Sequence, residues 1–211
     1  MNRLHYGNIR DFIKAIRADD YEFYDTYPNC KEVLIVGSSN AGKSSLLNAL
    51  NAEAKVAKTR KKSGKTQSLH FFHCRQTLNA RRGHARQGML IDSPGYGHTF
   101  VPVKVKNQFK KLMAMYLSHA VRLNLVLMLV DARTGLKTSD RDMLQQLYHY
   151  QKPVQLVISK VDRIKTGRVG LTERLERTAA ETRVYPNVYP EIYLLSAKHG
   201  FGIKELRARV A

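Results

Sequence analysis

With 211 residues, of which 43% are hydrophobic, the chain is long enough for one well-buried α/β domain and too short for two. No apolar run approaches the roughly 18 residues of a membrane span, so we expect no membrane partner. The 36 Lys and Arg against 17 Asp and Glu give a net charge of +19, which argues against a signalling protein with acidic partners. Such an excess favours a polyanionic partner, and nucleic acid is the first candidate. The alternative explanation is that the charge reflects a basic organellar proteome.

The first 29 residues are expected to form an N-terminal extension. Residues 8–18 predict a short amphipathic helix, because four apolar residues fall on one face at helical spacing: Ile9, Phe12, Ile13 and Ile16. No linker divides the remainder, so residues 30–211 are expected to form a single domain.

A strand, a glycine-rich loop and a helix follow each other in residues 32–50. The apolar run Val33–Val36 predicts a buried parallel strand, and the leucines between positions 46 and 50 predict a helix. Between them, residues 37–44 read GSSNAGKS and fit the phosphate-loop pattern GxxxxGK[ST] in its required setting. Glycine allows backbone N–H groups to approach a polyphosphate, at which the helix N-terminus also points.

This phosphate loop predicts a nucleotide site without saying which base is bound. Lys43 would reach the β and γ phosphates, and the Ser44 hydroxyl would bind Mg²⁺. A Gly/Ser-rich turn between strand and helix is the alternative interpretation. The loop residues expected to bind the nucleotide are Gly37, Ser38, Asn40, Ala41, Gly42, Lys43, Ser44 and Ser45.

A strongly basic loop comes next, in residues 55–66. It contains no acidic residue and almost no apolar periodicity, and its basic residues are Lys55, Lys58, Arg60, Lys61, Lys62 and Lys65. Residues 67–74 then predict a strand, residues 75–87 an enlarged basic hairpin, and residues 89–91 a short buried strand.

The buried strand at 89–91 runs into Asp92-Ser93-Pro94-Gly95. A carboxylate at the C-terminal end of a strand, followed by a glycine turn, is the place for a magnesium ligand and a γ-phosphate contact. We therefore expect Asp92 to hold Mg²⁺ through water and Gly95 to contact the γ-phosphate.

The second half of the chain alternates helices and strands. Helices are predicted at 104–121, 140–150, 171–183 and after Gly202, and strands at 125–130, 154–158 and 192–195. In the helix predicted at 104–121, four lysines lie on the side opposite the apolar stripe, and these lysines are either solvated or face nucleic acid. This alternation predicts a doubly wound α/β fold, with a mostly parallel sheet of about six strands and helices on both faces.

Two late motifs select the base. Asp162, in Ser159-Lys160-Val161-Asp162, is an acceptor with two oxygens that match the adjacent N1–H and N2–H₂ donors of guanine. Adenine has no matching donor pair, so it would leave the carboxylate unpaired. The Lys160 stem would lie along the base, and Ser196-Ala197-Lys198 would donate a backbone N–H to guanine O6.

The chain resembles the EngB family of ribosome-biogenesis GTP-binding proteins, within the translation-factor-like (TRAFAC) P-loop GTPases, over roughly residues 30–211. The matching segments are GSSNAGKSSLLNAL, SGKTQS, HFF, DSPGYG, SKVD and LSAKHGFGIKEL. The resemblance implies that Thr66 is the switch threonine that meets Mg²⁺ and the γ-phosphate. The implied metal ligands are thus Ser44, Thr66 and Asp92, and the implied catalytic residues are Lys43, Thr66 and Gly95. The sequence departs from the family's usual Arg, Pro, Leu and Thr at Ser38, Ser63, Ser93 and Ser159.

The resemblance also implies a biological role. It indicates a GTPase that binds GTP or GDP with Mg²⁺, assists assembly of the large ribosomal subunit, and works with other assembly factors. The implied partners are large-subunit rRNA and the pre-ribosomal particle, with the protein a monomer off the ribosome. The expected compartment is the mitochondrial matrix, and the alternative is the cytoplasm of a bacterium.

Residues near the γ-phosphate site predict slow hydrolysis without a partner. Tyr96 follows Gly95 where Ras-like enzymes place a water-orienting glutamine, and an aromatic ring cannot orient water in that way. Asn40 matches a residue that holds K⁺ in potassium-activated relatives; a turn residue with an unusual backbone angle is the alternative. The alternative functions are a tRNA-modification or transport GTPase, a metabolite kinase, and a protein that keeps GTP as a structural ligand.

Overall fold

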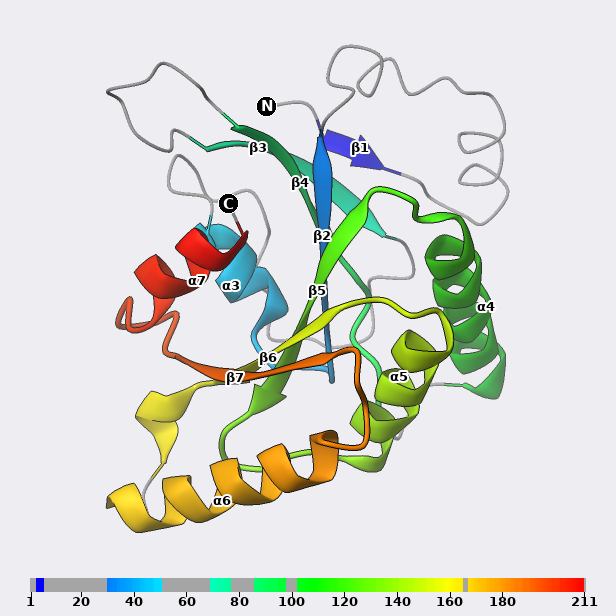
Figure 1. The fold of residues 1–211 in the computed structure, drawn as a ribbon. Helices are drawn as coiled ribbons and strands as arrows, with labels where there is room; N and C mark the ends of the chain where they lie inside the picture. Colours follow the sequence, from blue (N-terminus) through cyan, green and yellow to red (C-terminus); the bar gives the residue numbers. More distant parts are fainter. Residues whose placement is uncertain are drawn as a thin grey trace.

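The computed structural model describes residues 3–5, 30–50, 69–76, 86–97, 102–164 and 167–210 (Figure 1). The predicted helix at 8–18, the basic loop at 55–66 with Thr66, and the tip of the hairpin at 77–85 lie outside these residues.

One seven-stranded sheet runs through the molecule. Its spatial order is β1 (Arg3–His5), β3 (His70–Gln76), β4 (Arg86–Asp92), β2 (Lys31–Gly37), β5 (Leu123–Asp131), β6 (Val154–Ser159) and β7 (Val188–Leu195). Strands β4, β2, β5, β6 and β7 pair in parallel, whereas β3 is antiparallel to both β1 and β4. The predicted doubly wound, mostly parallel sheet is therefore confirmed, with β1 as an added edge strand.

Helices cover both faces of this sheet. They are α3 (Lys43–Leu50), α4 (Val103–His119), α5 (Thr138–His149), α6 (Gly167–Thr182) and α7 (Ile203–Val210). One core joins α4 and α5 to one face of β2 and β5, and a second joins α3 and α7 to the opposite face. A third, smaller cluster places α6 against the ends of β5 and β6 (Figure 1).

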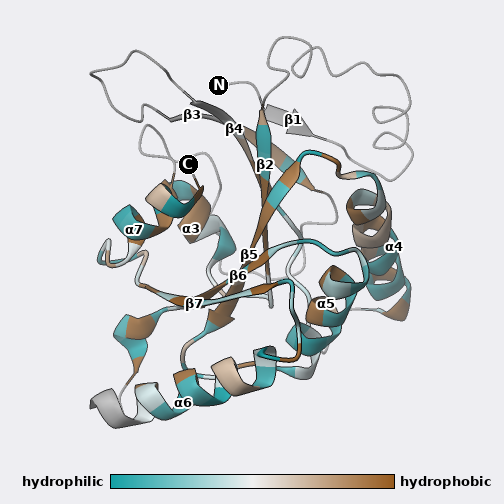
Figure 2. Ribbon diagram, viewed as in Figure 1, coloured by the Kyte–Doolittle hydropathy of each residue, from teal (hydrophilic) through white to brown (hydrophobic). Residues whose placement is uncertain are grey.

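The central strands are buried on both sides, which explains their continuous apolar runs. Every residue of β6 is buried, and in β5 only Asn124 is exposed. Strands covered by helices on both faces have no solvent side, so alternation with polar residues disappears. Figure 2 shows hydrophobic colour along these strands, while the outer helices are mixed. Of the helices in the described part of the chain, none has the length and apolar character that crossing a bilayer requires.

The parallel strands bring several predicted motifs to one edge of the sheet. The phosphate loop follows β2, Asp92 ends β4, Lys160 follows β6, and Ser196 follows β7. In open α/β sheets, the crevice beyond the C-terminal ends of the strands is the usual ligand site. The fold thereby assembles motifs that are far apart in the sequence.

Candidate functional site

The phosphate loop is a tight turn with three residues at positive φ, Gly37 at 157°, Asn40 at 65° and Gly42 at 105°. The Ala41 N–H donates to the Ser38 carbonyl at 3.0 Å and closes the turn. At the start of the loop, a Cβ on Gly37 would lie 2.7 Å from the Leu129 carbonyl of β5, so only glycine fits against the neighbouring strand.

The Lys43 ammonium lies inside this loop. Its Nζ donates to the carbonyls of Gly37 at 2.8 Å and Ser38 at 3.1 Å. Burial lowers the pKa of Lys43 to about 8, although the nearby Asp92 carboxylate opposes the shift. The loop thus holds one buried cation where a polyphosphate would bind.

Asp92 lies at the end of β4, next to the first turn of α3. The Ser44 hydroxyl donates to Asp92 Oδ2 at 3.4 Å. The other oxygen, Oδ1, is buried and has no hydrogen-bond partner among the described residues. Burial raises the pKa of Asp92 to about 6, against the opposing effects of Lys43 and the Ser44 hydrogen bond. A hydroxyl beside an unpaired carboxylate oxygen fits the oxygen ligands that Mg²⁺ prefers.

The turn that contains Gly95 packs directly against the phosphate loop. A Cβ on Gly95 would lie 2.9 Å from Lys43 Nζ and 2.8 Å from Ser39 Oγ. Next to it, the Ser39 N–H donates to the Tyr96 carbonyl at 2.8 Å. The backbone of this turn therefore approaches Lys43 more closely than any side chain at position 95 would allow.

The Tyr96 side chain points into the core. It is 8% exposed, and its ring lies 6.2 Å from the ring of Phe109 on α4. Burial and the Asp140 carboxylate raise the pKa of Tyr96 well above its usual value. A buried, neutral phenol packed on α4 is not placed to orient a water molecule at a phosphate.

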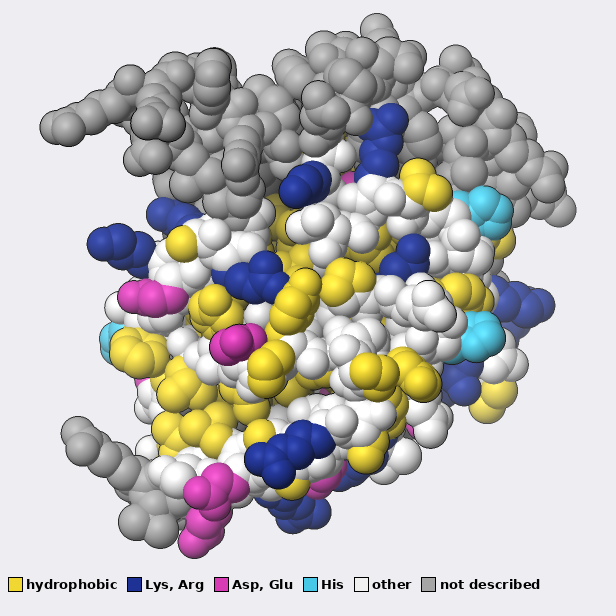
Figure 3. All heavy atoms as spheres, viewed as in Figure 1, with side chains coloured by type: hydrophobic (Ala, Val, Ile, Leu, Met, Phe, Trp, Pro, Cys, Tyr) yellow, Lys and Arg dark blue, Asp and Glu magenta, His cyan; other side chains and the backbone are white. Residues whose placement is uncertain are grey.

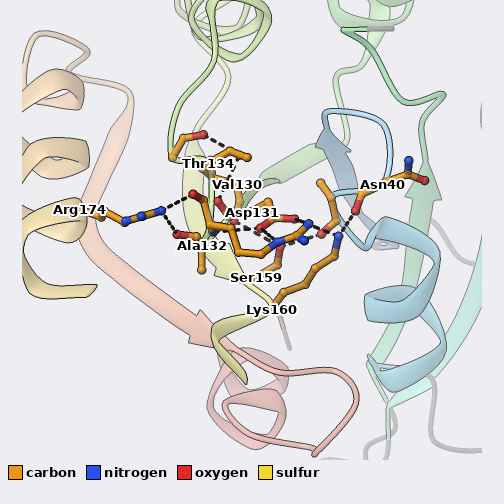
Figure 4. A network of polar contacts seen from close by, with 11 residues as sticks. Asn40, Val130, Asp131, Ala132, Thr134, Ser159, Lys160 and Arg174 are labelled. Atoms are coloured by element: carbon orange, nitrogen blue, oxygen red, sulfur yellow. Dashed lines mark hydrogen bonds and ion pairs between the residues drawn. The ribbon is translucent and has the colours of Figure 1, made fainter. Parts of the chain in front are cut away.

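Lys160 joins the base motif to the phosphate loop (Figure 4). It has left-handed backbone geometry, with φ at 59°, and its Nζ donates to the Asn40 carbonyl. The preceding Ser159 hydroxyl donates to the Ala41 carbonyl at 2.6 Å. The Lys160 side chain also passes close to the loop: its Cε lies 3.8 Å from the position that a Cβ on Gly42 would take.

The second base motif meets Asp162 through a side-chain hydrogen bond. The buried Ser196 hydroxyl donates to Asp162 Oδ1 at 2.7 Å. This bond holds the pKa of Asp162 below its usual value, so the carboxylate remains an acceptor. Ala197 and Lys198 continue the same turn, and the His199 N–H closes it on the Ser196 carbonyl at 3.2 Å.

Asp131, at the end of β5, is a residue that the sequence reasoning missed. Its Oδ2 lies 3.0 Å from Lys160 Nζ and accepts from Arg133 Nη2 at 2.8 Å. Burial opposes ionisation, but hydrogen bonds from Arg133 and Lys160 hold the pKa of Asp131 well below its usual range. Arg174 of α6 donates to the carbonyls of Ala132 and Arg133 and fixes the same turn (Figure 4). The available signal was its place at the end of an apolar strand, as for Asp92.

Comparisons with known proteins agree with this geometry. Residues 32–160 match the family model described as 50S ribosome-binding GTPase. A probable GTP-binding protein EngB of Rhodospirillum rubrum is 34% identical over 192 residues, which cover 89% of this chain and 79% of that protein. The corresponding protein of Jannaschia sp. is 35% identical over 211 residues, covering 99% and 88%.

A solved structure of Era is also similar. It contains MgGDPNP and nucleotides 1506–1542 of 16S ribosomal RNA. The TM-score is 0.65 with 27% identity, and the match covers 86% of this chain and 55% of that chain. The shared region therefore includes most of the fold described above and about half of the longer protein.

Proposed function

The chain belongs to the EngB family of GTP-binding proteins, and on that premise we propose that it assists assembly of the large ribosomal subunit by binding rRNA in a GTP-dependent way. As a P-loop GTPase, it binds GTP and GDP and hydrolyses GTP. The family description, 50S ribosome-binding, and the net charge of +19 support a partner rich in phosphate. Pre-ribosomal particles and other assembly factors are the partners we propose.

The observation that carries the proposed switch is the contact between the Gly95 turn and Lys43. The position that a Cβ on Gly95 would take is 2.9 Å from Lys43 Nζ, so one γ-phosphate can meet both groups. Lys43 supplies positive charge, and the Gly95 N–H would donate to a γ-phosphate oxygen. Loss of that phosphate on hydrolysis removes the bond and releases the turn.

The cation sites are part of the proposal. Ser44 and Asp92 would hold Mg²⁺ together with Thr66, which ends the basic loop at 55–66. The ion neutralises phosphate charge when it is bound. The orphaned Oδ1 of Asp92 supports this assignment. Asn40, whose backbone has positive φ, would contribute to a K⁺ site beside the phosphates.

Guanine selection is assigned to Asp162, with Lys160 along the base and the turn of Ser196, Ala197 and Lys198 against O6. The hydrogen bond from Ser196 orients Asp162 and leaves one carboxylate oxygen and further lone pairs for the base. The direction of Tyr96 into the core supports slow hydrolysis that waits for a partner or a monovalent cation.

A salt titration on a large-subunit rRNA fragment tests the RNA-binding role. The phosphate contacts are assigned first to the basic loop, which lies outside the described residues. Replacing Lys58, Arg60, Lys61 and Lys62 by Ala should reduce the slope of log K against log salt by roughly three units, at about 0.7–0.9 per contact. GTP binding should persist, because Lys43 and Thr66 are retained.

The same titration separates the competing functions. Tighter rRNA binding by the GTP form than by the GDP form supports the assembly role. A preference for tRNA would favour a tRNA-modification GTPase, and equal RNA affinity in both nucleotide states would favour a structural role for GTP.

The compartment is a separate proposal. The strong positive charge favours the mitochondrial matrix, whereas the relatives described above come from bacteria and favour a bacterial cytoplasm. Identifying whether a bacterial or a mitochondrial large subunit co-purifies with the tagged protein distinguishes the two.

A further inference from the structure

We propose that the lysine face of α4, defined as Lys104, Lys106, Lys110 and Lys111, is a second surface for the RNA backbone, separate from the basic loop. This inference rests on the proposed function, since it names a contact surface for the same partner. It depends on charge, exposure and the connection of α4 to the nucleotide site.

The lysine face concentrates positive charge that the described part of the chain does not neutralise. All four side chains are exposed, and α4 contains no acidic residue. None of the four makes an ion pair with another described residue. By contrast, Arg141 and Arg177 are both paired with Glu181, at 2.6 and 3.0 Å. Figure 3 shows dark blue side chains along the right-hand edge, where α4 lies in the same view of Figure 1.

The position of these lysines along α4 strengthens the case for an anionic partner. The helix is held to the core mainly by its second half, through Leu112, Met113, Tyr116 and Leu117. The first half carries the lysines, and Val103 at its start is 72% exposed. The positive end of a helix dipole disfavours lysine in the first turn, so a phosphate placed there would be favoured by both charges. Exposed Asn107 and Gln108 add polar groups between the lysines.

Such a surface should bind phosphates without reading bases. Lysine is a point charge on a flexible stem, and contacts of this kind fix position without sequence information. Each neutralised phosphate releases counterions, so the contribution of this face is measurable as a salt slope.

Tyr96 connects the lysine face to the nucleotide site. Its carbonyl accepts from Ser39 in the phosphate loop at 2.8 Å, and its ring lies 6.2 Å from the ring of Phe109, which is on the core side of α4 and precedes Lys110 in the sequence. Any movement of the Gly95 turn that follows loss of the γ-phosphate therefore reaches the first half of α4. We infer that RNA affinity at this face depends on the nucleotide, with Phe109 as the transmitting residue.

The test is RNA binding by the full chain with all four α4 lysines replaced by Gln, measured as a salt titration with a large-subunit rRNA fragment. The slope should fall by roughly three units while GTP affinity is unchanged. The matched Lys→Arg quadruple variant should bind as the parent does. A second control, Arg163→Gln with Arg183→Gln and Lys204→Gln, removes exposed charges elsewhere and should change the slope less per charge removed.

Three outcomes separate the claims. A parent that fails to bind rRNA overturns the proposed function itself. A parent that binds, together with a Gln variant of equal affinity and slope, overturns only the assignment to α4. In Phe109→Ala protein, the ratio of GTP-form to GDP-form RNA affinity should move towards one with GTP binding retained; an unchanged ratio removes Phe109 from the connection.

Discussion

Replacing Asp131 by Asn should weaken nucleotide binding by releasing Lys160 from the phosphate loop. Asp131 Oδ1 accepts from the N–H and Nε of Arg133, each at 3.0 Å, and Oδ2 accepts from Arg133 Nη2 and Lys160 Nζ. An amide keeps only one of these acceptors and turns the other into a donor. The substitution therefore removes the charge and places donor against donor.

The magnitude follows from the exposure of the two partners. A hydrogen bond to a charged group contributes about 1.5–3 kcal/mol, and an exposed ion pair about 0–1 kcal/mol. The Arg133 side chain is 46% exposed and loses little, whereas Lys160 is 21% exposed and is the main loss. A loss of about 1.5 kcal/mol corresponds to roughly tenfold weaker binding. GTP and GDP should be affected alike, because Lys160 is assigned to the base and not to the γ-phosphate.

The assay is titration of a fluorescent guanine nucleotide, with thermal unfolding measured in parallel. Arg133→Ala is the matched control, since it removes the exposed partner and leaves the contact between Asp131 and Lys160. It should weaken binding by less than about fivefold, the equivalent of about 1 kcal/mol. Nucleotide affinity at the parent's level in Asp131→Asn protein, or an equal loss in both variants, would show that the contact between Asp131 and Lys160 does not support nucleotide binding.

Three further substitutions test the site. Lys43→Ala removes the buried ammonium and should weaken GTP and GDP binding at least about 100-fold with the fold retained by circular dichroism; parental affinity would falsify the phosphate-loop assignment. Asp162→Asn should exchange GTP for xanthosine triphosphate in a nucleotide panel, and equal binding of ATP and GTP by the parent and the variant would contradict guanine selection. Asp140→Asn should change the pH dependence of folding: burial raises the Asp140 pKa despite a backbone hydrogen bond from Lys137, so the native parent binds more protons than the unfolded chain above pH 3.8 and loses stability as pH rises towards 7. The variant lacks this loss, so its stability relative to the parent should grow over that range in urea titrations. Parallel dependences of the unfolding free energy on pH in the two proteins would contradict the raised pKa of Asp140.

Hydrophobic pattern predicted the buried strands well and their ends less well. The prediction of a strand at 125–130 lies within β5, which extends from Leu123 to Asp131 because its ends are determined by backbone pairing with β2 and β6. The predicted strand at 192–195 is only the last part of β7, whose first residues are partly or fully exposed at the sheet edge. Strand β1, with three residues, carries no pattern to detect.

The residues of the candidate site also differ in whether their roles can be predicted from the local sequence. Lys43, Asp92, Lys160 and Asp162 follow from local motifs, since each motif has a fixed spacing that can be read within a few residues. The role of Asp131 depends on Lys160, which is 29 positions away and comes close only because β5 and β6 are neighbours in the sheet. The inward direction of Tyr96 likewise depends on Phe109 and Asp140, which belong to other elements.

Capture of RNA by the tagged protein is the most direct test of the proposal that the GTP form binds large-subunit rRNA. The protein would be recovered with a non-hydrolysable GTP analogue and, in parallel, with GDP, and the bound RNA sequenced. Large-subunit rRNA should be enriched with the analogue relative to GDP, and Lys43→Ala protein should lose this enrichment. Equal recovery in both nucleotide states, or enrichment of tRNA or small-subunit rRNA instead, would rule out GTP-dependent binding of large-subunit rRNA.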